Sequence, residues 1–248
     1  AMAVLVITQN IQAPILYGAG LAVGIVMLIL SLSGLLDWLA GKIPACVVRG
    51  IQFGLGLSLA SLALKKYVPS MGHDGYILAL ICFMIMIVLL GNRRFPPGVF
   101  VIGLGFLYAV IFRVDLSSVT HSVGFNLPQL ALPKGADILT GFLVLSLPQL
   151  PLSISNSVIA TNKTVHDLFP ERPLSVKKIG LTYSVINLIL PFFGGVPICH
   201  GCGGLAGHYA LGARTGGSVI IYGAAFMVIG LFFSGAFQQV IEFFPQPI

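Results

Sequence analysis

The feature that most constrains this chain is a series of apolar segments about as long as a lipid bilayer is thick. A helix needs about 20 apolar residues to cross the hydrocarbon layer. Only 8% of the residues are charged and the mean hydropathy is +1.01, whereas soluble domains carry about 25% charged residues. We therefore expect an all-α polytopic protein that crosses the cell membrane several times, in contact with lipid. The candidate spans are residues 15–36, 47–64, 76–90, 97–112, 138–160, 179–193 and 218–237.

The positive charges predict the orientation of the spans. We let the spans alternate and count two shorter apolar pieces, residues 1–9 and 198–209, as half-crossings. An excess of Lys and Arg marks the cytoplasmic side, so we place the larger group of basic residues there. The net charge of +6 is spread thinly over loops, which argues against a nucleic-acid partner. The larger group is Lys42, Arg49, Arg93, Arg94, Lys163, Arg172, Lys177, Lys178 and Arg214, and the smaller is Lys65, Lys66, Arg113 and Lys134.

The stretch from Phe193 to Gly216 combines glycine, histidine and cysteine between two spans. Gly194-Gly195-Val196-Pro197 ends the preceding span, because glycine frees the backbone and proline cannot continue a helical ladder. A short helix that starts near His200 or Gly201 would turn unpaired amides into the protein, where the helix dipole favours an anion. Interrupted helices of this kind hold the substrate in many secondary transporters; the alternative is a re-entrant loop that only packs. The candidate anion-binding residues are His200, Gly201, Cys202, Gly203 and Gly204.

A second group of polar residues interrupts the span at 138–160. Pro148 and Pro151 each remove a backbone donor there, so we expect a disrupted helix with free carbonyls. Polar side chains at membrane depth cost free energy and tend to face a cavity or a neighbouring helix. They either line a site opposite the short helix or hydrogen-bond between helices. The candidates are Gln149, Ser153 and Asn156, with weaker ones, Thr8 and Gln9, in the first short apolar piece.

Glycines recur within several spans at spacings that let helices approach one another. Gly20-x-x-x-Gly24 and Gly50-x-x-x-Gly54 have the small-residue pattern of closely packed membrane helices. We expect tight packing from them, and a sliding surface between moving bundles is the alternative. Further glycines of this kind are Gly18, Gly56, Gly103 and Gly105.

Other classes of function lack their sequence motifs. The chain contains neither Gly-x-x-x-x-Gly-Lys-Ser/Thr nor His-Glu-x-x-His, so we expect neither ATP-driven transport nor an enzyme, and no bound cofactor or metal. Acidic residues are almost absent from the spans, which favours a neutral or anionic substrate. Four metal-ligand side chains do occur close together, although their spacing is not that of a zinc finger. A membrane metal-binding protein therefore remains an alternative, built on Cys199, His200, Cys202 and His208.

Two longer motifs resemble those of the plant and bacterial molybdate transporters, distant relatives of the sulfate permeases that lack their cytoplasmic regulatory domain. One runs from Gly194 to Gly216, and the other runs from Leu147 to Ala160 with Asp167-Leu-Phe-Pro-Glu171 after it. The pair Gly34-Leu-Leu-Asp-Trp38 and Val48-Arg-Gly-Ile-Gln52 is similar as well. The resemblance implies an inverted repeat of seven plus seven segments, with a core bundle, a gate bundle and half-helices at the midplane of the membrane.

The resemblance also implies how the chain divides. Residues 1–248 would form a single transmembrane transporter domain that is incomplete and truncated at both ends. Residues 1–13 and 137–216 would supply core-bundle elements, including the half-helices at 1–9 and 198–209. Residues 44–112 and 217–248 would mainly supply other core and gate spans.

The function implied by the resemblance is secondary active transport of a tetrahedral oxyanion, foremost molybdate, by alternating access. The amides of Cys202, Gly203 and Gly204 would hold the anion with His200 as a donor, and Gln149 and Asn156 would contribute from the facing helix. A sulfate, other anion or nucleobase-type permease of the same fold is an alternative, and so is an assembly or scaffold subunit. The sequence leaves open a coupling proton or sodium ion and a homodimer.

Overall fold

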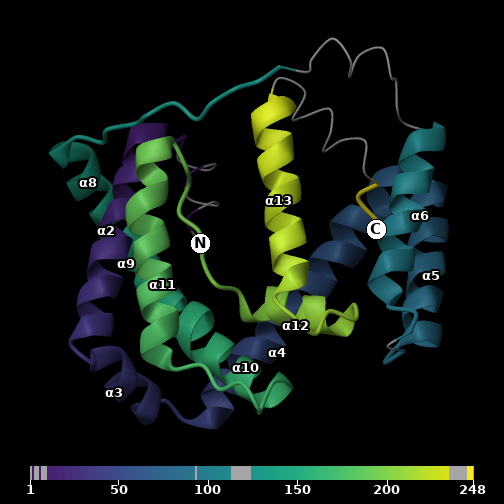
Figure 1. The fold of residues 1–248 in the computed structure, drawn as a ribbon, viewed down its shortest axis with the longest axis horizontal. Coiled ribbons are helices and arrows are strands. Elements are labelled where there is room, and N and C mark those ends of the chain that lie inside the picture. The colour runs from purple at the N-terminus through teal and green to yellow at the C-terminus, as the bar shows by residue number, and fades with distance from the viewer. Residues whose placement is uncertain are drawn as a thin grey trace. The chain divides into compact units, whose positions relative to one another are not determined.

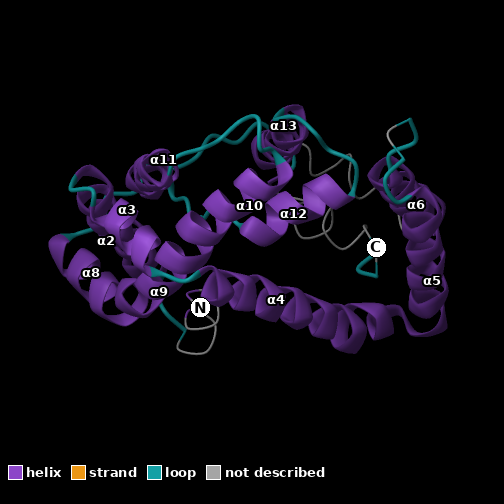
Figure 2. Cartoon of the chain, turned by 90° about the horizontal axis from the view of Figure 1, so that it is seen from below, coloured by secondary structure: helices purple, strands orange, loops and turns teal. Residues whose placement is uncertain are grey.

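The computed structural model describes residues 2, 6, 10–92, 94–112, 124–234 and 245–247 (Figure 1). Within these ranges the regular elements are helices, joined by loops (Figure 2), as the sequence predicts. They fall into two compact units. Unit 1 comprises Ala1–Leu55 and Pro128–Leu205, and unit 2 comprises Gly56–Leu127 and Ala206–Ile248.

Unit 1 is built around α2 (Ala13–Leu32). Pro14 lies in the first turn of α2, where a helix does not need the missing N–H. The helix ends before Gly34, whose φ of +76° starts a turn into the short α3 (Leu35–Lys42). Two other helices of the unit, α8 (Gly135–Gly141) and α11 (Val176–Ile189), pack against α2. The buried apolar cluster between these elements consists of Val23, Met27, Leu36, Val158, Ile179 and Tyr183.

Glycine allows α2 to approach both of its neighbours closely. A methyl group at Gly18 would lie 2.5 Å from the carbonyl oxygen of Asp137, and one at Gly24 would lie 3.1 Å from the backbone nitrogen of Leu188. The tight packing expected for these glycines is therefore confirmed. Around Gly50 and Gly54 on α4 (Ala45–Leu62), a methyl group would meet no atom within 4 Å among the described residues, so the expectation of tight packing stays a prediction there.

A continuous helical stretch, Gly135–Leu168, carries the two prolines of the polar insertion. It consists of α8, a π-helical segment (Phe142–Ser146, η3), α9 (Leu147–Leu152), a second π-helical segment (Ser153–Ala160, η4) and α10 (Thr161–Leu168). A proline in a helix interior removes one hydrogen bond and crowds the carbonyl four residues before it. Wider turns next to Pro148 and Pro151 accommodate this, so the helix continues to Leu168 where the sequence predicted disruption and an end at Ala160.

Unit 2 contains α5 (Gly72–Leu89), α6 (Pro97–Phe112) and α13 (Gly217–Phe232). Large apolar side chains of all three helices are exposed, as expected for helices that are apolar all round and face lipid. Backbone hydrogen bonds join its segments: Gly98 donates to Leu211 at 3.1 Å, and Asn126 donates to Leu231 at 2.8 Å.

Four helical stretches in the described part are long and apolar enough to cross a membrane: Ala13–Leu32, Cys46–Leu89, Gly135–Leu168 and Val176–Phe193. The 44 residues of Cys46–Leu89 would measure about 66 Å in a straight helix, roughly twice the hydrocarbon thickness. Two predicted spans, 47–64 and 76–90, lie in this stretch, on either side of a π-helical segment (Ala63–Tyr67, η1) and a 3₁₀ turn (Val68–Met71, η2). In its described part every predicted span is mainly helical, with turns at residues 33–34 and at Leu90 and a bend at Phe233.

Candidate functional site

The predicted helix break after residue 193 is present in unit 1. Helix α11 continues as a 3₁₀ turn (Leu190–Phe193, η5) and stops at Gly194, which has a left-handed φ of +69°. Residues 195–201 are not helical, and α12 (Cys202–Ala210) follows. The prediction placed the start near His200 or Gly201 and the half-helix at 198–209, so the observed helix begins slightly later.

The first turn of α12 presents backbone donors. The N–H of Leu205 donates to the carbonyl of Gly201 at 3.1 Å, which is the first bond of the helix. The amides of Cys202, Gly203 and Gly204 precede this bond and have no carbonyl acceptor within the helix. These are the amides that the sequence assigned to anion binding.

Asn187 on α11 fixes the non-helical segment that leads to α12. Its side chain is fully buried. Nδ2 donates to the carbonyl of Ile198 at 2.9 Å, and the N–H of Ile198 donates to Oδ1 at 3.1 Å. Nδ2 also donates to the carbonyl of Tyr183 at 2.9 Å. The carboxamide thus pairs with Ile198 as a neighbouring strand would, and it holds the segment alongside α11 (Figure 1).

His200 lies at the end of this segment and is half-buried. Its Nε2 is 2.9 Å from Oγ1 of Thr182 on α11, and its ring meets the ring of Tyr183 edge-on with 6.2 Å between centroids.

The π-helical segment η4 and the start of α10 face the first residue of α12. The thiol of Cys202 donates to Oδ1 of Asn156 at 2.9 Å. Oγ1 of Thr161 donates to the carbonyl of Asn156 at 3.1 Å and lies 3.5 Å from the carbonyl of His200. Cys202 also packs into a buried cluster with Val48, Ile159 and Ala160. The structure therefore brings Asn156 to the short helix.

The other polar candidates have different neighbours. Oγ of Ser153 lies 2.8 Å from the hydroxyl of Tyr183, and both residues are buried, so Ser153 hydrogen-bonds between helices. Oε1 of Gln149 accepts from the backbone N–H of Met2 at 3.3 Å. Gln149 thereby contacts the first short apolar piece of the chain. Thr8 and Gln9, from the same piece, lie outside the described residues.

The alternative of a metal site finds no support in the described ranges. No group of three or more His, Cys, Asp or Glu side chains there could hold a metal ion. Of the four proposed ligands, Cys202 bonds to Asn156, His200 lies against Thr182, and His208 packs edge-on against Tyr222 with 6.1 Å between ring centroids.

Sequence reasoning missed the residues that support His200 and the segment before it. Thr182 and Asn187 lie inside an apolar span, and an uncharged polar residue at such depth is itself a signal for a functional or inter-helix contact. Thr161 follows the polar insertion directly and was not distinguished from it.

A protein-family model matches residues 1–59 and 141–248, which include α12 and most of the helical stretch that faces it. The family is described as molybdate transporters of the MFS superfamily. The chain belongs to this family. The resemblance seen in the sequence motifs is thereby confirmed.

Three curated relatives are also named molybdate transporters. Molybdate transporter 1 of Arabidopsis thaliana is 32% identical over 287 residues, which cover 99% of this chain and 62% of the relative. Molybdate transporter 2 of the same plant is 33% identical over 274 residues, 92% of this chain and 58% of the relative. Molybdate transporter 1 of Chlamydomonas reinhardtii is 36% identical over 161 residues, 62% of this chain and 31% of the relative. The chain thus spans less than two thirds of the length of these relatives.

A solved structure shows the same fold. The transmembrane domain of the cyanobacterial bicarbonate transporter BicA aligns with a TM-score of 0.57 and 17% sequence identity, over 99% of this chain and 68% of that chain. The long apolar helices, the family and the fold agree on one localisation. This member of the molybdate transporter family is an integral, multi-pass membrane protein.

Proposed function

We propose that the protein is a secondary active transporter of a tetrahedral oxyanion, with molybdate as its substrate. Its family and its curated relatives are named for molybdate transport. The proposal assigns it no enzymatic step and no resident cofactor. Binding and release of the anion would follow alternating access, in which a core bundle moves against a gate bundle.

The observation that carries the proposal is the start of α12, placed against η4 and α10. A helix N-terminus offers unpaired amides and a positive dipole end to an anion. The amides of Cys202, Gly203 and Gly204 would bind the oxyanion, with Gly201 and the glycines of the first turn allowing close approach. The sequence contains no Asp or Glu between residues 138 and 166 or between residues 173 and 241, so no carboxylate of these stretches opposes a negative ligand.

Side chains would complete the anion site from two directions. Asn156 uses Oδ1 to accept from Cys202, which leaves the two hydrogens of Nδ2 as donors for an oxyanion. His200 would contribute a donor from the segment before α12. We keep Gln149 of α9 as a contributor because it contacts Met2 of the first short apolar piece, and we keep Thr8 and Gln9 of that piece with it.

We extend the proposal to the inverted repeat that the resemblance implies. Residues 1–13 and 137–216 would belong to the core bundle, and residues 44–112 and 217–248 mainly to other core and gate spans. The grouping of Ala1–Leu55 with Pro128–Leu205 in one compact unit supports this for residues up to 205, and so does the likeness to the BicA fold.

Uptake of labelled molybdate into liposomes that contain the purified full-length protein tests the function. We expect saturable uptake that excess unlabelled molybdate or tungstate abolishes and that equal sulfate reduces only weakly. Equal competition by sulfate would favour the general sulfate-permease alternative. Absence of saturable uptake, together with absence of molybdate binding to the purified protein, would contradict transport of this anion.

A further inference from the structure

The hydroxyl of Thr182 determines which ring nitrogen of His200 carries the hydrogen. Oγ1 of Thr182 lies 3.1 Å from the carbonyl of Lys178 and 3.0 Å from that of Ile179, as well as 2.9 Å from Nε2 of His200. A threonine hydroxyl has one hydrogen to donate. If that hydrogen pointed to His200, Oγ1 would face two carbonyl oxygens with no hydrogen between. The hydroxyl therefore donates to the helix backbone, the usual bond of a threonine inside a helix, and accepts from Nε2–H.

This assignment leaves the second ring nitrogen without a hydrogen in the neutral state. A neutral imidazole carries one N–H and one lone pair, so Nδ1 of His200 is an acceptor once Nε2 donates to Thr182. Nδ1 is the ring nitrogen nearer to the backbone of His200, and His200 is two residues before Cys202. Among the described residues it has no hydrogen-bond partner. An oxyanion offers only acceptors, so a neutral His200 held in this way cannot donate to it.

We infer that oxyanion binding at the start of α12 takes up one proton at Nδ1 of His200, so that substrate and proton bind together. The inference rests on the proposed function and adds its coupling ion. A protonated ring donates from both nitrogens: Nε2 keeps its bond to Thr182, and Nδ1 gains a hydrogen for the anion. The positive ring and the negative oxyanion then stabilise each other in a site of low polarity.

The described surroundings of His200 do not stabilise a positive charge on its ring, so its protonation depends on the bound anion. In the described part of the chain His200 forms no ion pair with a carboxylate. A half-buried imidazole without such a partner favours its neutral form when the site is empty. The charge of the anion then supplies the favourable interaction that raises its proton affinity. The titratable or charged residues on the elements next to it are Lys177, Lys178 and Tyr183 on α11, Cys199 in the segment before α12, Cys202, His208 and Tyr209 on α12, and Lys163, His166 and Asp167 on α10.

Binding of molybdate and of tungstate to the purified full-length protein, measured between about pH 6 and pH 8, tests the inference. Uptake of one proton makes the affinity fall about tenfold for each pH unit above the pKa of the free site. Calorimetry in two buffers of different ionisation enthalpy should show the matching proton uptake. The variant His200→Gln, which keeps a polar side chain but cannot be protonated, should bind more weakly with a flat pH profile.

Two variants of Thr182 test the proton assignment. If Thr182 were only structural, the two variants would show the same pH dependence of binding. Thr182→Val removes the acceptor, so the neutral ring can carry its hydrogen on Nδ1, and the pH profile should flatten. Thr182→Ser keeps the hydroxyl and should keep the slope. The two variants differ in the acceptor at Nε2, and their contrast remains informative if His200→Gln fails to fold.

The possible outcomes separate the inference from the function on which it rests. Binding that is independent of pH in the native protein, or a slope that persists in His200→Gln or in Thr182→Val, overturns the proton linkage and leaves oxyanion transport standing. Absence of molybdate and tungstate binding at every pH overturns the proposed function and the inference with it. A tenfold slope that Thr182→Val and His200→Gln both remove supports the linkage.

Discussion

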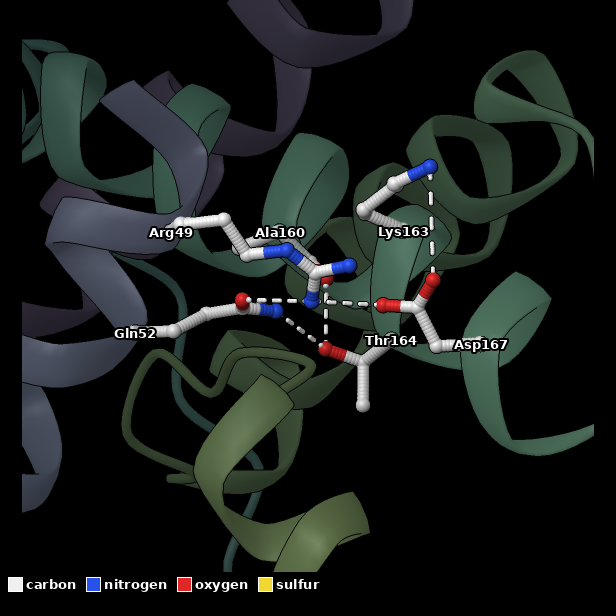
Figure 3. A network of polar contacts seen from close by, with 6 residues as sticks. All are labelled: Arg49, Gln52, Ala160, Lys163, Thr164 and Asp167. Atoms are coloured by element: carbon white, nitrogen blue, oxygen red, sulfur yellow. Dashed lines mark hydrogen bonds and ion pairs between the residues drawn. The ribbon is translucent and has the colours of Figure 1, made fainter. Parts of the chain in front are cut away.

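Nη1 of Arg49 on α4 lies 2.6 Å from Oδ2 of Asp167 on α10 and joins two helices of unit 1 that are far apart in the sequence (Figure 3). The same nitrogen donates to Oε1 of Gln52 at 3.2 Å, and Nε2 of Gln52 donates to Oγ1 of Thr164 at 2.7 Å. Nζ of Lys163 approaches Asp167 at 4.0 Å. Arg49 and Gln52 belong to one sequence motif of the family resemblance, and Asp167 belongs to another. The network therefore gives residues of two motifs outside the candidate anion site a structural role, which is to join α4 to α10.

Replacement of Arg49 should cost little stability. The side chains of Arg49 and Asp167 are 53% and 31% exposed, and ion pairs at such positions contribute about 0.2–1 kcal/mol. We expect Arg49→Ala and Asp167→Ala each to lower the unfolding temperature in detergent slightly, and the double variant to add little to either. Lys163→Ala, which removes the longer contact, is the control and should have less effect. Additive losses from Arg49→Ala and Asp167→Ala would show that the pair contributes no coupling.

The positions of the helices could be predicted from the sequence because each apolar run is long and bounded by charged, glycine or proline residues. The run that ends at Gly194 and the α6 span at 97–112 are examples. Partners across the sequence could not be predicted. Nothing local to Gln52 indicates that its amide meets Thr164, 112 residues later, because that contact depends on how two helices pack in space.

Glycine at position 18 should be required for the packing of α2 against α8. A methyl group there would lie 2.5 Å from the carbonyl oxygen of Asp137, and backbone atoms cannot move aside as a flexible side chain can. We expect Gly18→Ala to destabilise the protein by about 1–3 kcal/mol, the usual cost of overpacking. Thermal unfolding in detergent measures this.

The control is Gly54→Ala on α4, where a methyl group meets no atom within 4 Å among the described residues. Alanine favours the helix over glycine by up to about 1 kcal/mol, so this variant should be unchanged or slightly more stable. Equal losses from Gly18→Ala and Gly54→Ala would contradict the packing described for Gly18.

The candidate site shows a similar division between what the sequence reveals and what it does not. The break, the start of α12 and the presence of His200 beside it follow from Gly194, Pro197 and the glycines after Cys202. The helix begins after Ile198 because the N–H and the carbonyl of Ile198 both bond to Asn187 and are not available to the hydrogen-bond ladder of α12. That pairing joins a side chain to a backbone 11 residues away, which local sequence preferences do not reveal.

The hydroxyl of Tyr183 should stabilise the protein through its bond to Ser153. The two oxygens are 2.8 Å apart and both residues are buried. Tyr183→Phe and Ser153→Ala each leave one buried hydroxyl without this partner, so each should cost about 1–3 kcal/mol. The double variant leaves neither hydroxyl and should cost less than the sum of the two. A strictly additive double variant would show that the bond contributes nothing in the membrane protein.

Asn187 should matter both for stability and for anion binding. Asn187→Leu has a side chain of similar size but leaves the N–H and carbonyl of Ile198 without their partners on Asn187, in two partly buried hydrogen bonds. We expect a loss of about 1–2 kcal/mol in unfolding free energy, the net contribution of the partly buried hydrogen bonds that are removed. Because the segment from Ile198 to Gly201 would lose its attachment to α11, the affinity for molybdate should fall as well. Thermal unfolding and molybdate binding measure the two effects.

Ser184→Ala is the matched control for Asn187→Leu. Ser184 is on the same helix and equally buried, but its hydroxyl donates only within α11, to the carbonyl of Gly180 at 2.7 Å. This variant should change stability by less than Asn187→Leu and leave the affinity for molybdate unchanged. If Asn187→Leu lost stability but kept native affinity at a temperature where it remains folded, the segment before α12 would not need its bond to α11 to hold the anion. A fall in affinity confined to Asn187→Leu would assign the placement of α12 to this one carboxamide.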